Sequence, residues 1–277
     1  PHAHARITAI DASAARNMPG VHAVVTRDDL DGLNPTYGYF IKDQPIVAID
    51  KVRYIGDTVA AVAAETELQA VAALERITVE YDLLPVVPTI DTAMAEGAPE
   101  LFEEEPMGIV PAYGQGASGA RRIGRNNCYR FSYETGAAEA FDTCDRIFED
   151  RFVFSRDQHF HLEPFVTVAR MDGDVRTGVM ADGTFVARSG RILLDAGAYS
   201  DASPLVAEKA GYRLPGPYKW QHLNIDCDCI LTNTTPAGPY RGFGGTQASW
   251  ASESQIDIIA RALGRDPLDL RMQNVKD

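Results

Sequence analysis

The sequence predicts an α+β fold arranged in two domains, on the strength of three observations. A chain of 277 residues is longer than one hydrophobic core usually requires, so two units are expected. Hydrophobic side chains make up 45% and charged ones 23%, which is typical of globular proteins. Strand-like and helix-like segments alternate over residues 5–90 and again after residue 128. We therefore expect domains at 1–102 and 128–277, joined by a linker at 103–127 that is rich in glycine and arginine.

The first domain is predicted to place a helix on one face of a sheet. Thr66 is a suitable N-cap for the helix, and Pro85 and Pro88 end the strand that follows it. Strands are expected at residues 21–26, 58–63 and 77–81, and the helix at 67–76. The predicted core comprises Val24, Val59, Ala61, Val71, Leu74 and Val79.

The second domain shows the same mixture of alternating and helical patterns. Gly264 is expected to end its long helix, and Asp266 to cap the next one, with Pro267 in the first turn. Strands are predicted at 129–134, 146–155, 165–171, 186–194 and 223–231, and helices at 137–141 and 247–263.

Charge and hydropathy exclude two classes of partner. Thirty-nine acidic and 26 basic side chains give a net charge of −13, so most of the surface repels nucleic acid. No apolar run reaches the roughly 20 residues that span a bilayer, so no membrane span is expected. The chain opens Pro1-His2-Ala3-His4 without a visible signal peptide, which predicts a cytoplasmic protein. Because the sequence reads as beginning inside a longer one, a periplasmic location stays open as the alternative.

The four cysteines are interpreted as reduced structural thiols. Cys128 and Cys144 are isolated, and only Cys227 and Cys229 are close neighbours. That pair alone does not complete a tetrahedral metal site. The spacing also lacks the closely set cysteines of an iron–sulfur cluster, so no such cluster is expected here.

A glycine-rich loop around Arg241 is the strongest candidate site. Three glycines surround Arg241 and Phe243 between a predicted strand and a helix, so the backbone can approach a ligand closely. The guanidinium of Arg241 suits an oxyanion, and the ring of Phe243 suits a planar molecule, so we expect that ring to face a cavity rather than the core. A tight turn with a surface arginine explains the same residues equally well, because glycine-rich loops are common.

A second cluster contains His159, His161 and Glu163, which would share one face of a strand. These are ligands of a facial metal site, but side chains in a row stand about 7 Å apart, too far for one ion without a kink. Buried, hydrogen-bonded polar residues are the favoured interpretation. The glycine spacing at residues 114–119 matches a dinucleotide fingerprint only by chance, since no strand precedes it and no helix follows.

Both predicted domains resemble parts of the xanthine dehydrogenase/aldehyde oxidase family. The first resembles its α/β hammerhead domain, through Pro1 to Ile7, Asp43 to Ile46, Lys51 to Ala60 and Val79 to Pro85. The second resembles part of its first molybdopterin-binding domain, a mixed α/β unit, through His161 to Pro164, Leu194 to Tyr199, Arg241 to Gly244 and Gly264 to Pro267.

The resemblance implies the large subunit of a molybdenum hydroxylase. Such an enzyme uses a molybdenum ion, held through molybdopterin cytosine dinucleotide rather than by protein ligands, to oxidise an aldehyde or N-heteroaromatic substrate with oxygen from water. Partner subunits with 2Fe-2S clusters and FAD then accept the electrons, so a hetero-oligomer is expected. By the same resemblance, Arg241 lies at the molybdenum centre as a catalytic and cofactor-binding residue, Gly242 and Gly244 bind the cofactor, and Phe243 binds the substrate.

The sequence also departs from the family pattern. A segment with a second glycine-rich loop is expected between Asp174 and Val175, where the chain runs on directly. The family's second molybdopterin-binding domain, which supplies the glutamate base, does not follow. A non-catalytic assembly fragment without molybdenum is therefore the alternative interpretation, and a zinc or iron protein using His159, His161 and Glu163 is a more distant one.

Overall fold

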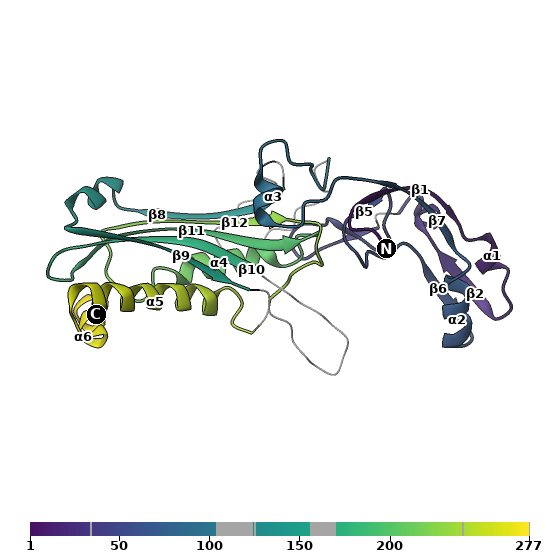
Figure 1. Cartoon of the computed structure of the whole chain (residues 1–277). Coiled ribbons are helices and arrows are strands. Elements are labelled where there is room, and N and C mark those ends of the chain that lie inside the picture. The colour runs from purple at the N-terminus through teal and green to yellow at the C-terminus, as the bar shows by residue number, and fades with distance from the viewer. Residues whose placement is uncertain (34, 104–123, 125, 156–169, 240, 277) are drawn as a thin grey trace.

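The computed structural model has an elongated shape with two unequal parts (Figure 1). A smaller part at the N-terminal end contains short strands and helices, and a larger part contains a long sheet with helices packed below it. Among the described residues, no helix is long and apolar enough to cross a membrane. The structure describes all residues except 34, 104–123, 125, 156–169, 240 and 277.

The smaller part is built from a three-stranded antiparallel sheet and a two-stranded one. The first has the order β5 (Lys51–Val52), β1 (Ala5–Asp11) and β7 (Thr78–Leu83). The second pairs β2 (Val21–Val25) with β6 (Ala61–Ala64), and α2 (Glu67–Leu74) packs beside it. The remaining elements are α1 (Ser13–Arg16), a 3₁₀ turn at Arg27–Leu30, β3 (Thr36–Tyr37) and β4 (Gln44–Pro45).

The strand and helix order of this part is confirmed, but its predicted core is largely wrong. Val24 is buried, Val59 and Val79 are half-buried, and Ala61, Val71 and Leu74 are exposed. The reason is the orientation of α2. Its buried position is Ala73, because a small side chain lets the helix approach β2 and β6 closely, while Leu68, Val71 and Leu74 face away.

The larger part is a five-stranded sheet with the order β8-β12-β11-β10-β9. The parallel pair β11 and β12 is joined by α4, and all other neighbours are antiparallel. Helices α4 and α5 cover one face, whereas α3 lies on the other face near β12 (Figure 1). The bounds are β8 (Asn127–Thr135), β9 (Arg146–Phe154), β10 (Arg170–Val179), β11 (Phe185–Gly197), β12 (His222–Leu231), α3 (Ile90–Met94), α4 (Ser203–Arg213), α5 (Gly245–Leu263) and α6 (Pro267–Asn274).

The capping residues in the sequence correctly predict where α5 ends and where α6 begins. Gly264 ends α5 in the left-handed conformation with φ of 66°, and the Asp266 carboxylate accepts from the Leu268 and Asp269 amides at 2.7 and 3.1 Å. The predicted helix at 137–141 is a 3₁₀ segment, Ala138–Thr143. The strand predicted at 165–171 lies mostly outside the described residues.

The sequence pattern did not predict α4, because most residues on its buried side are small. Gly211 shows how closely it packs: a β-carbon there would overlap the ring of Phe131 on β8. The other buried residues of α4 are Ser203, Pro204, Val206, Ala207 and Ala210. A face of small residues gives only a weak helical pattern of hydrophobicity. The function of these residues is to let the helix pack closely against the sheet, which only the tertiary structure shows.

Strand β10 runs without interruption through Asp174 and Val175. Asp174 pairs with Arg151 on β9 and Arg191 on β11, and Val175 continues both registers. The point at which the family segment was expected is therefore the middle of a strand that is bonded on both sides.

The two parts share a core and a set of polar contacts. Phe40, Ile41, Val87, Ile90 and Leu101 belong to the same buried cluster as residues of β8, β11, β12 and α4. The predicted division at residue 102 stays a prediction. Asp57 and Tyr199 form one polar contact across the two parts, with the hydroxyl donating to the carboxylate at 2.8 Å, and Asp43 accepts from the Ser200 amide at 2.9 Å.

Candidate functional site

The loop at residues 241–245 begins α5 and rests directly on α4. Gly242 and Gly244 have backbone φ angles of 78° and 69°, which residues with a side chain rarely adopt. A β-carbon at Gly244 would overlap the Val206 carbonyl oxygen and come within 3.1 Å of the Ala210 amide nitrogen. The Gly245 and Thr246 amides donate to the Gly242 carbonyl at 2.9 and 3.2 Å. The glycines thus fix the loop against α4, as well as making the turn.

Arg241 and Phe243 point to different surroundings. Arg241 is exposed, and no ion pair or hydrogen bond joins its guanidinium to another described residue. Phe243 is half-buried and packs against the main core, with Lys209 Nζ 6.0 Å from the ring centroid. The expectation that this ring faces a cavity rather than the core is therefore wrong in part. Its role as a substrate contact stays a prediction.

A buried arginine that the sequence did not single out holds the two helices together. Arg188 on β11 is fully buried; its Nε donates to Thr177 Oγ1 at 3.1 Å, and its Nη1 donates to the Leu214 carbonyl and to Ser252 Oγ at 3.0 and 2.5 Å. The Trp220 ring lies 4.5 Å from the guanidinium carbon. Burial lowers the pKa of Arg188 to about 10, so the charge persists at neutral pH. Arg188 thereby fixes the end of α4 relative to α5.

Gln255 fixes α5 to the sheet in a similar way. Its side-chain amide donates to the Val175 carbonyl at 2.6 Å and to Asp150 Oδ2 at 3.0 Å, and its carbonyl oxygen accepts from Thr177 Oγ1 at 2.6 Å. Together with Arg188, it gives α5 a defined position. Because the Arg241 loop leads directly into α5, the position of the helix also sets the position of the loop.

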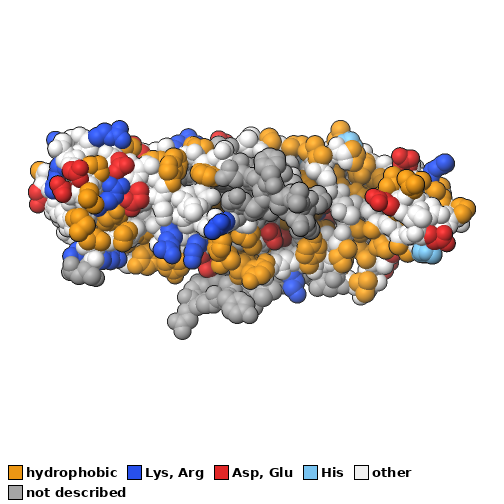
Figure 2. Space-filling model, turned by 90° about the horizontal axis from the view of Figure 1, so that it is seen from below, with side chains coloured by type: hydrophobic (Ala, Val, Ile, Leu, Met, Phe, Trp, Pro, Cys, Tyr) orange, Lys and Arg blue, Asp and Glu red, His pale blue; other side chains and the backbone are white. Residues whose placement is uncertain are grey.

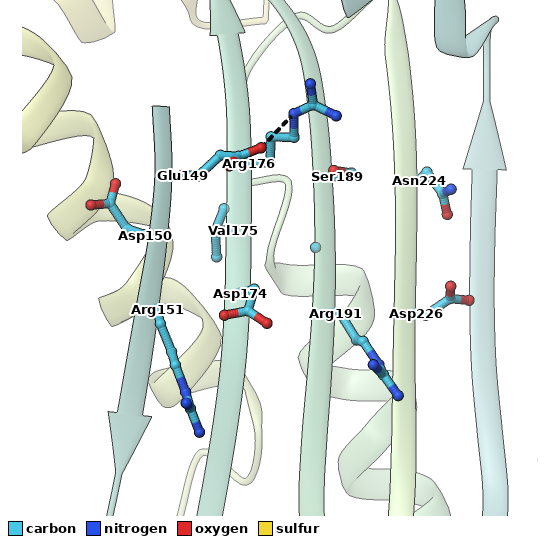
Figure 3. A pocket seen from close by; sticks show the side chains of 11 residues that line it. Glu149, Asp150, Arg151, Asp174, Val175, Arg176, Ser189, Arg191, Asn224 and Asp226 are labelled. Carbon is cyan, nitrogen blue, oxygen red and sulfur yellow. Dashed lines mark ion pairs between the residues drawn. The ribbon is translucent and has the colours of Figure 1, made fainter. Parts of the chain in front are cut away.

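The opposite face of the sheet carries a hollow of about 490 Å³ lined by charged side chains (Figure 3). The helices lie behind the strands in this view, so the hollow is on the side away from the Arg241 loop. Along one row across the strands, Arg151, Asp174, Arg191 and Asp226 alternate in sign. Arg151 also pairs with Asp172, and Arg176 pairs with Glu149 at 2.9 Å. Opposite charges are neighbours on this face, so its charges largely balance.

The cysteines support the structural interpretation. Cys128, Cys227 and Cys229 are free and buried, and Cys144 is free and half-buried. Burial raises the pKa of the Cys227 and Cys229 thiols, which favours the protonated form and opposes metal binding. Among the described residues, no group of three or more His, Cys, Asp or Glu side chains could hold a metal ion. His159, His161, Glu163 and the glycines at 114–119 lie outside the described residues.

Two separate regions of this chain match known domain families. Residues 1–85 match the a/b hammerhead domain of aldehyde oxidase and xanthine dehydrogenase, and residues 171–275 match the molybdopterin cofactor-binding domain. The second match contains the Arg241 loop and both helices that hold it.

Curated relatives align with nearly the whole chain. A probable xanthine dehydrogenase component of Bacillus subtilis is 27% identical over 99% of this chain and 46% of its own length. The nicotinate dehydrogenase large molybdopterin subunit of Eubacterium barkeri is 27% identical over 98% of this chain and 79% of its own length. The aldehyde oxidoreductase of Megalodesulfovibrio gigas is 26% identical over 98% of this chain and 38% of its own length. The chain thus spans less than half the length of two of these relatives.

The relatives also contain segments that this chain lacks. The alignment with the Bacillus subtilis protein extends over 360 positions, whereas this chain has 277 residues, so at least 83 positions have no counterpart here. Solved structures share the fold: aldehyde oxidoreductase from Desulfovibrio gigas matches with a TM-score of 0.84 and 22% identity, covering 100% of this chain and 39% of that one. CO dehydrogenase from Oligotropha carboxidovorans matches with a TM-score of 0.82 and 24% identity, covering 100% of this chain and 46% of that one.

Proposed function

Because the chain belongs to the xanthine dehydrogenase/aldehyde oxidase family, we propose that it is part of the large subunit of a molybdenum-dependent hydroxylase. One observation carries the proposal: a hammerhead match at 1–85 and a molybdopterin cofactor-binding match at 171–275 occur together in a single chain. We further propose the division into 1–102, the linker 103–127 and 128–277, with a family segment missing between Asp174 and Val175. The alignment gaps of at least 83 positions support a missing segment.

The residues of the loop fit an anionic part of a molybdopterin cofactor. Arg241 is exposed and not paired with any described residue, and Gly242 and Gly244, which carry no side chain, leave room for a ligand to approach the backbone closely. We propose these three residues as the part of the site that this chain contributes, and the cytosine dinucleotide as the form of the cofactor. When bound, the molybdenum centre supplies oxygen transfer from water and accepts two electrons.

The protein's own residues orient the reactants and balance their charge. The planar guanidinium of Arg241 offers a fork of hydrogen-bond donors to an oxyanion. The half-buried ring of Phe243 offers an apolar surface to a planar substrate, and the core behind it limits its movement. The close packing of Gly244 on α4 holds the loop that carries both side chains against the helix pair.

The proposed substrate is an aldehyde or an N-heteroaromatic compound, and the proposed partners are subunits with a 2Fe-2S cluster and FAD. Two of the relatives are named as single subunits of larger enzymes, which supports a hetero-oligomer. Co-expression with candidate partner subunits, followed by metal analysis and an assay with an artificial electron acceptor, tests the function. Stoichiometric molybdenum with substrate-dependent reduction is expected. A correctly folded complex that contains molybdenum but oxidises no aldehyde or heteroaromatic compound would refute it.

A non-catalytic assembly fragment is the second candidate function. The uninterrupted pairing of β10 through Asp174 and Val175 favours it, because the sheet closes without the missing segment. This fragment would contain no molybdenum, whereas the hydroxylase would contain one ion per chain. Metal content and an intact-mass measurement together separate the two.

A further inference from the structure

Strand β9 is an outer strand of the large sheet. It pairs with β10 on one side, and within the described part of the chain no strand pairs with its other side. All nine of its residues are at least partly exposed, whereas most residues of β11 and β12 are buried. A long edge with free backbone donors and acceptors is a template for pairing with another strand. The side chains of β9 decide which strand fits.

These side chains alternate between the two faces of the sheet. On the helix side, Phe152 packs against Trp250, and Asp150 accepts from Gln255 Nε2 at 3.0 Å. The open face carries the other set, in the order Ile147, Glu149, Arg151 and Val153. The two apolar members of this set are 42% and 49% exposed. The open face of the edge thus has an apolar residue near each end and one charge of each sign between them.

The charges of the open face alternate in sign from strand to strand up to this edge (Figure 3). Arg151 lies opposite Asp174 on β10, and Asp174 lies opposite Arg191 on β11. In the next row, Glu149 lies opposite Arg176 and forms an ion pair with it at 2.9 Å. Opposite charges facing each other across a strand pair are stabilising, and like charges are destabilising. An added strand therefore fits best if it places an acidic residue opposite Arg151 and a basic residue opposite Glu149.

A second copy of β9 meets both requirements when the two strands run antiparallel with their Asp150 residues opposite each other. In that register Arg151 faces the second copy's Glu149, and Glu149 faces the second copy's Arg151, so the alternation of sign continues across the edge. Ile147 also faces the second copy's Val153, which covers the exposed apolar residues. Moving the centre of the pairing by one residue would instead oppose two copies of Glu149 or two copies of Arg151.

Apolar exposure alone does not single out this edge. On the underside of the molecule, hydrophobic side chains reach the surface in several places (Figure 2). The match of charges and apolar residues in one register is more specific. We propose that β9 binds β9 of a second copy of this chain, antiparallel and centred on Asp150, so that the two large sheets join into one continuous sheet. This assembly does not depend on the proposed reaction.

The same register limits the strength of the contact. The two Asp150 carboxylates lie opposite each other on the helix side, where like charges repel. Gln255 binds each carboxylate within its own chain but does not remove the charge. A contact through one strand pair is also smaller than the interface of a permanent dimer. We therefore expect a reversible dimer with a dissociation constant of about 10–100 μM.

Sedimentation velocity of the full 277-residue chain measures this association. The wild type should change from monomer to dimer between about 1 and 300 μM. Asp150→Asn removes the repulsion, keeps an oxygen that can accept from Gln255, and should lower the dissociation constant about threefold. A wild type that stays monomeric throughout this range would overturn the proposal. So would an association that Asp150→Asn leaves unchanged or weakens.

Two double variants with charges at the same exposed positions test the register. In Ile147→Lys/Val153→Lys, lysine faces lysine at both ends of the strand pair, and the dissociation constant should rise at least about tenfold. In Ile147→Glu/Val153→Lys, glutamate faces lysine, and the dissociation constant should stay within about threefold of the wild-type value. Urea unfolding checks that both variants are folded. Equal association of the two variants would contradict the register.

Cross-linking with the thiol oxidant diamide adds a test that depends on distance. Opposite Cα atoms of an antiparallel pair lie about 4.5–5.5 Å apart, which a disulfide can bridge. Asp150→Cys should therefore give a cross-linked dimer on a non-reducing gel. Glu149→Cys should not, because its two copies are diagonal neighbours about 7–8 Å apart. The wild type, whose cysteines are free, gives the background. If β9 binds a different subunit instead, neither variant will cross-link in the isolated chain, and the proposal is wrong.

Discussion

Replacement of Gly244 by alanine should destabilise the larger part of the protein more than an ordinary loop substitution. Two costs combine at this position. The left-handed backbone, with φ of 69°, costs an alanine about 1–2 kcal/mol. The added β-carbon also overlaps the Val206 carbonyl oxygen, which cannot move without disturbing α4, and such overpacking costs about 1–3 kcal/mol. The expected loss in the free energy of unfolding is therefore about 2–5 kcal/mol.

Gly264→Ala provides the matched control for Gly244→Ala. Gly264 has nearly the same backbone conformation, with φ of 66°, at the other end of the same helix, but a β-carbon there meets nothing within 4 Å. Its loss should be only the backbone cost of about 1–2 kcal/mol. Urea unfolding followed by the fluorescence of Trp220 and Trp250, both in the larger part, measures each loss. Equal losses in the two variants would refute the close contact of the loop with α4.

Four further outcomes are expected. Arg241→Lys in the molybdenum-loaded enzyme should lower turnover about tenfold or more, and Arg241→Ala more still, at equal metal occupancy; wild-type turnover in the alanine variant would exclude this loop from the active site. Phe243→Ala should raise KM for planar substrates about fivefold, from roughly 1 kcal/mol of lost ring contact, and an unchanged KM would count against that role. Arg188→Met should lower the free energy of unfolding by about 2–4 kcal/mol in urea, since it leaves buried hydroxyl and carbonyl groups without a donor. Burial raises the pKa of Asp57 above 3.8, so the folded state favours its protonated form, and the wild type should lose stability relative to Asp57→Asn as pH rises from 4 to 7; a difference constant over that range would contradict this.

Local signals in the sequence were sufficient wherever the structure depends on local interactions. The cap at Asp266 and the stop at Gly264 act within one helical turn, and both are present as expected. The strands at β2, β7, β8, β9, β11 and β12 and the long helix α5 were also found from periodicity. The burial of a helix depends on its neighbours instead. In α2, the large side chains Leu68, Val71 and Leu74 gave the stronger pattern, yet Ala73 is the residue that faces the core.

In the candidate site, too, the sequence predicted the residue types of the loop but not its contacts with distant parts of the chain. Its residue types, an arginine and a phenylalanine among glycines, were visible in the sequence, and the resemblance indicated their use. Their surroundings were not visible, because both residues that hold or approach the loop lie more than 30 residues from it in sequence: Lys209 approaches the Phe243 ring from α4, and Arg188 on the sheet joins the end of α4 to α5. The half-burial of Phe243 against the main core has the same origin.

The contacts beneath the loop explain how the fold can hold several cations together. The buried Arg188 donates to the Leu214 carbonyl at the C-terminal end of α4 and to Ser252 within α5, and Gly244 allows the first turn of α5 to sit directly on α4. The repulsion of exposed like charges on a helix is about 0.2–0.5 kcal/mol per pair, smaller than the roughly 1–3 kcal/mol at stake when a single buried donor or acceptor loses its partner. The core contacts therefore dominate, and they keep Lys209 and Arg213 beside the loop despite the repulsion between the two charges. An exposed substitution such as Lys209→Met should consequently leave the geometry of the helix pair unchanged.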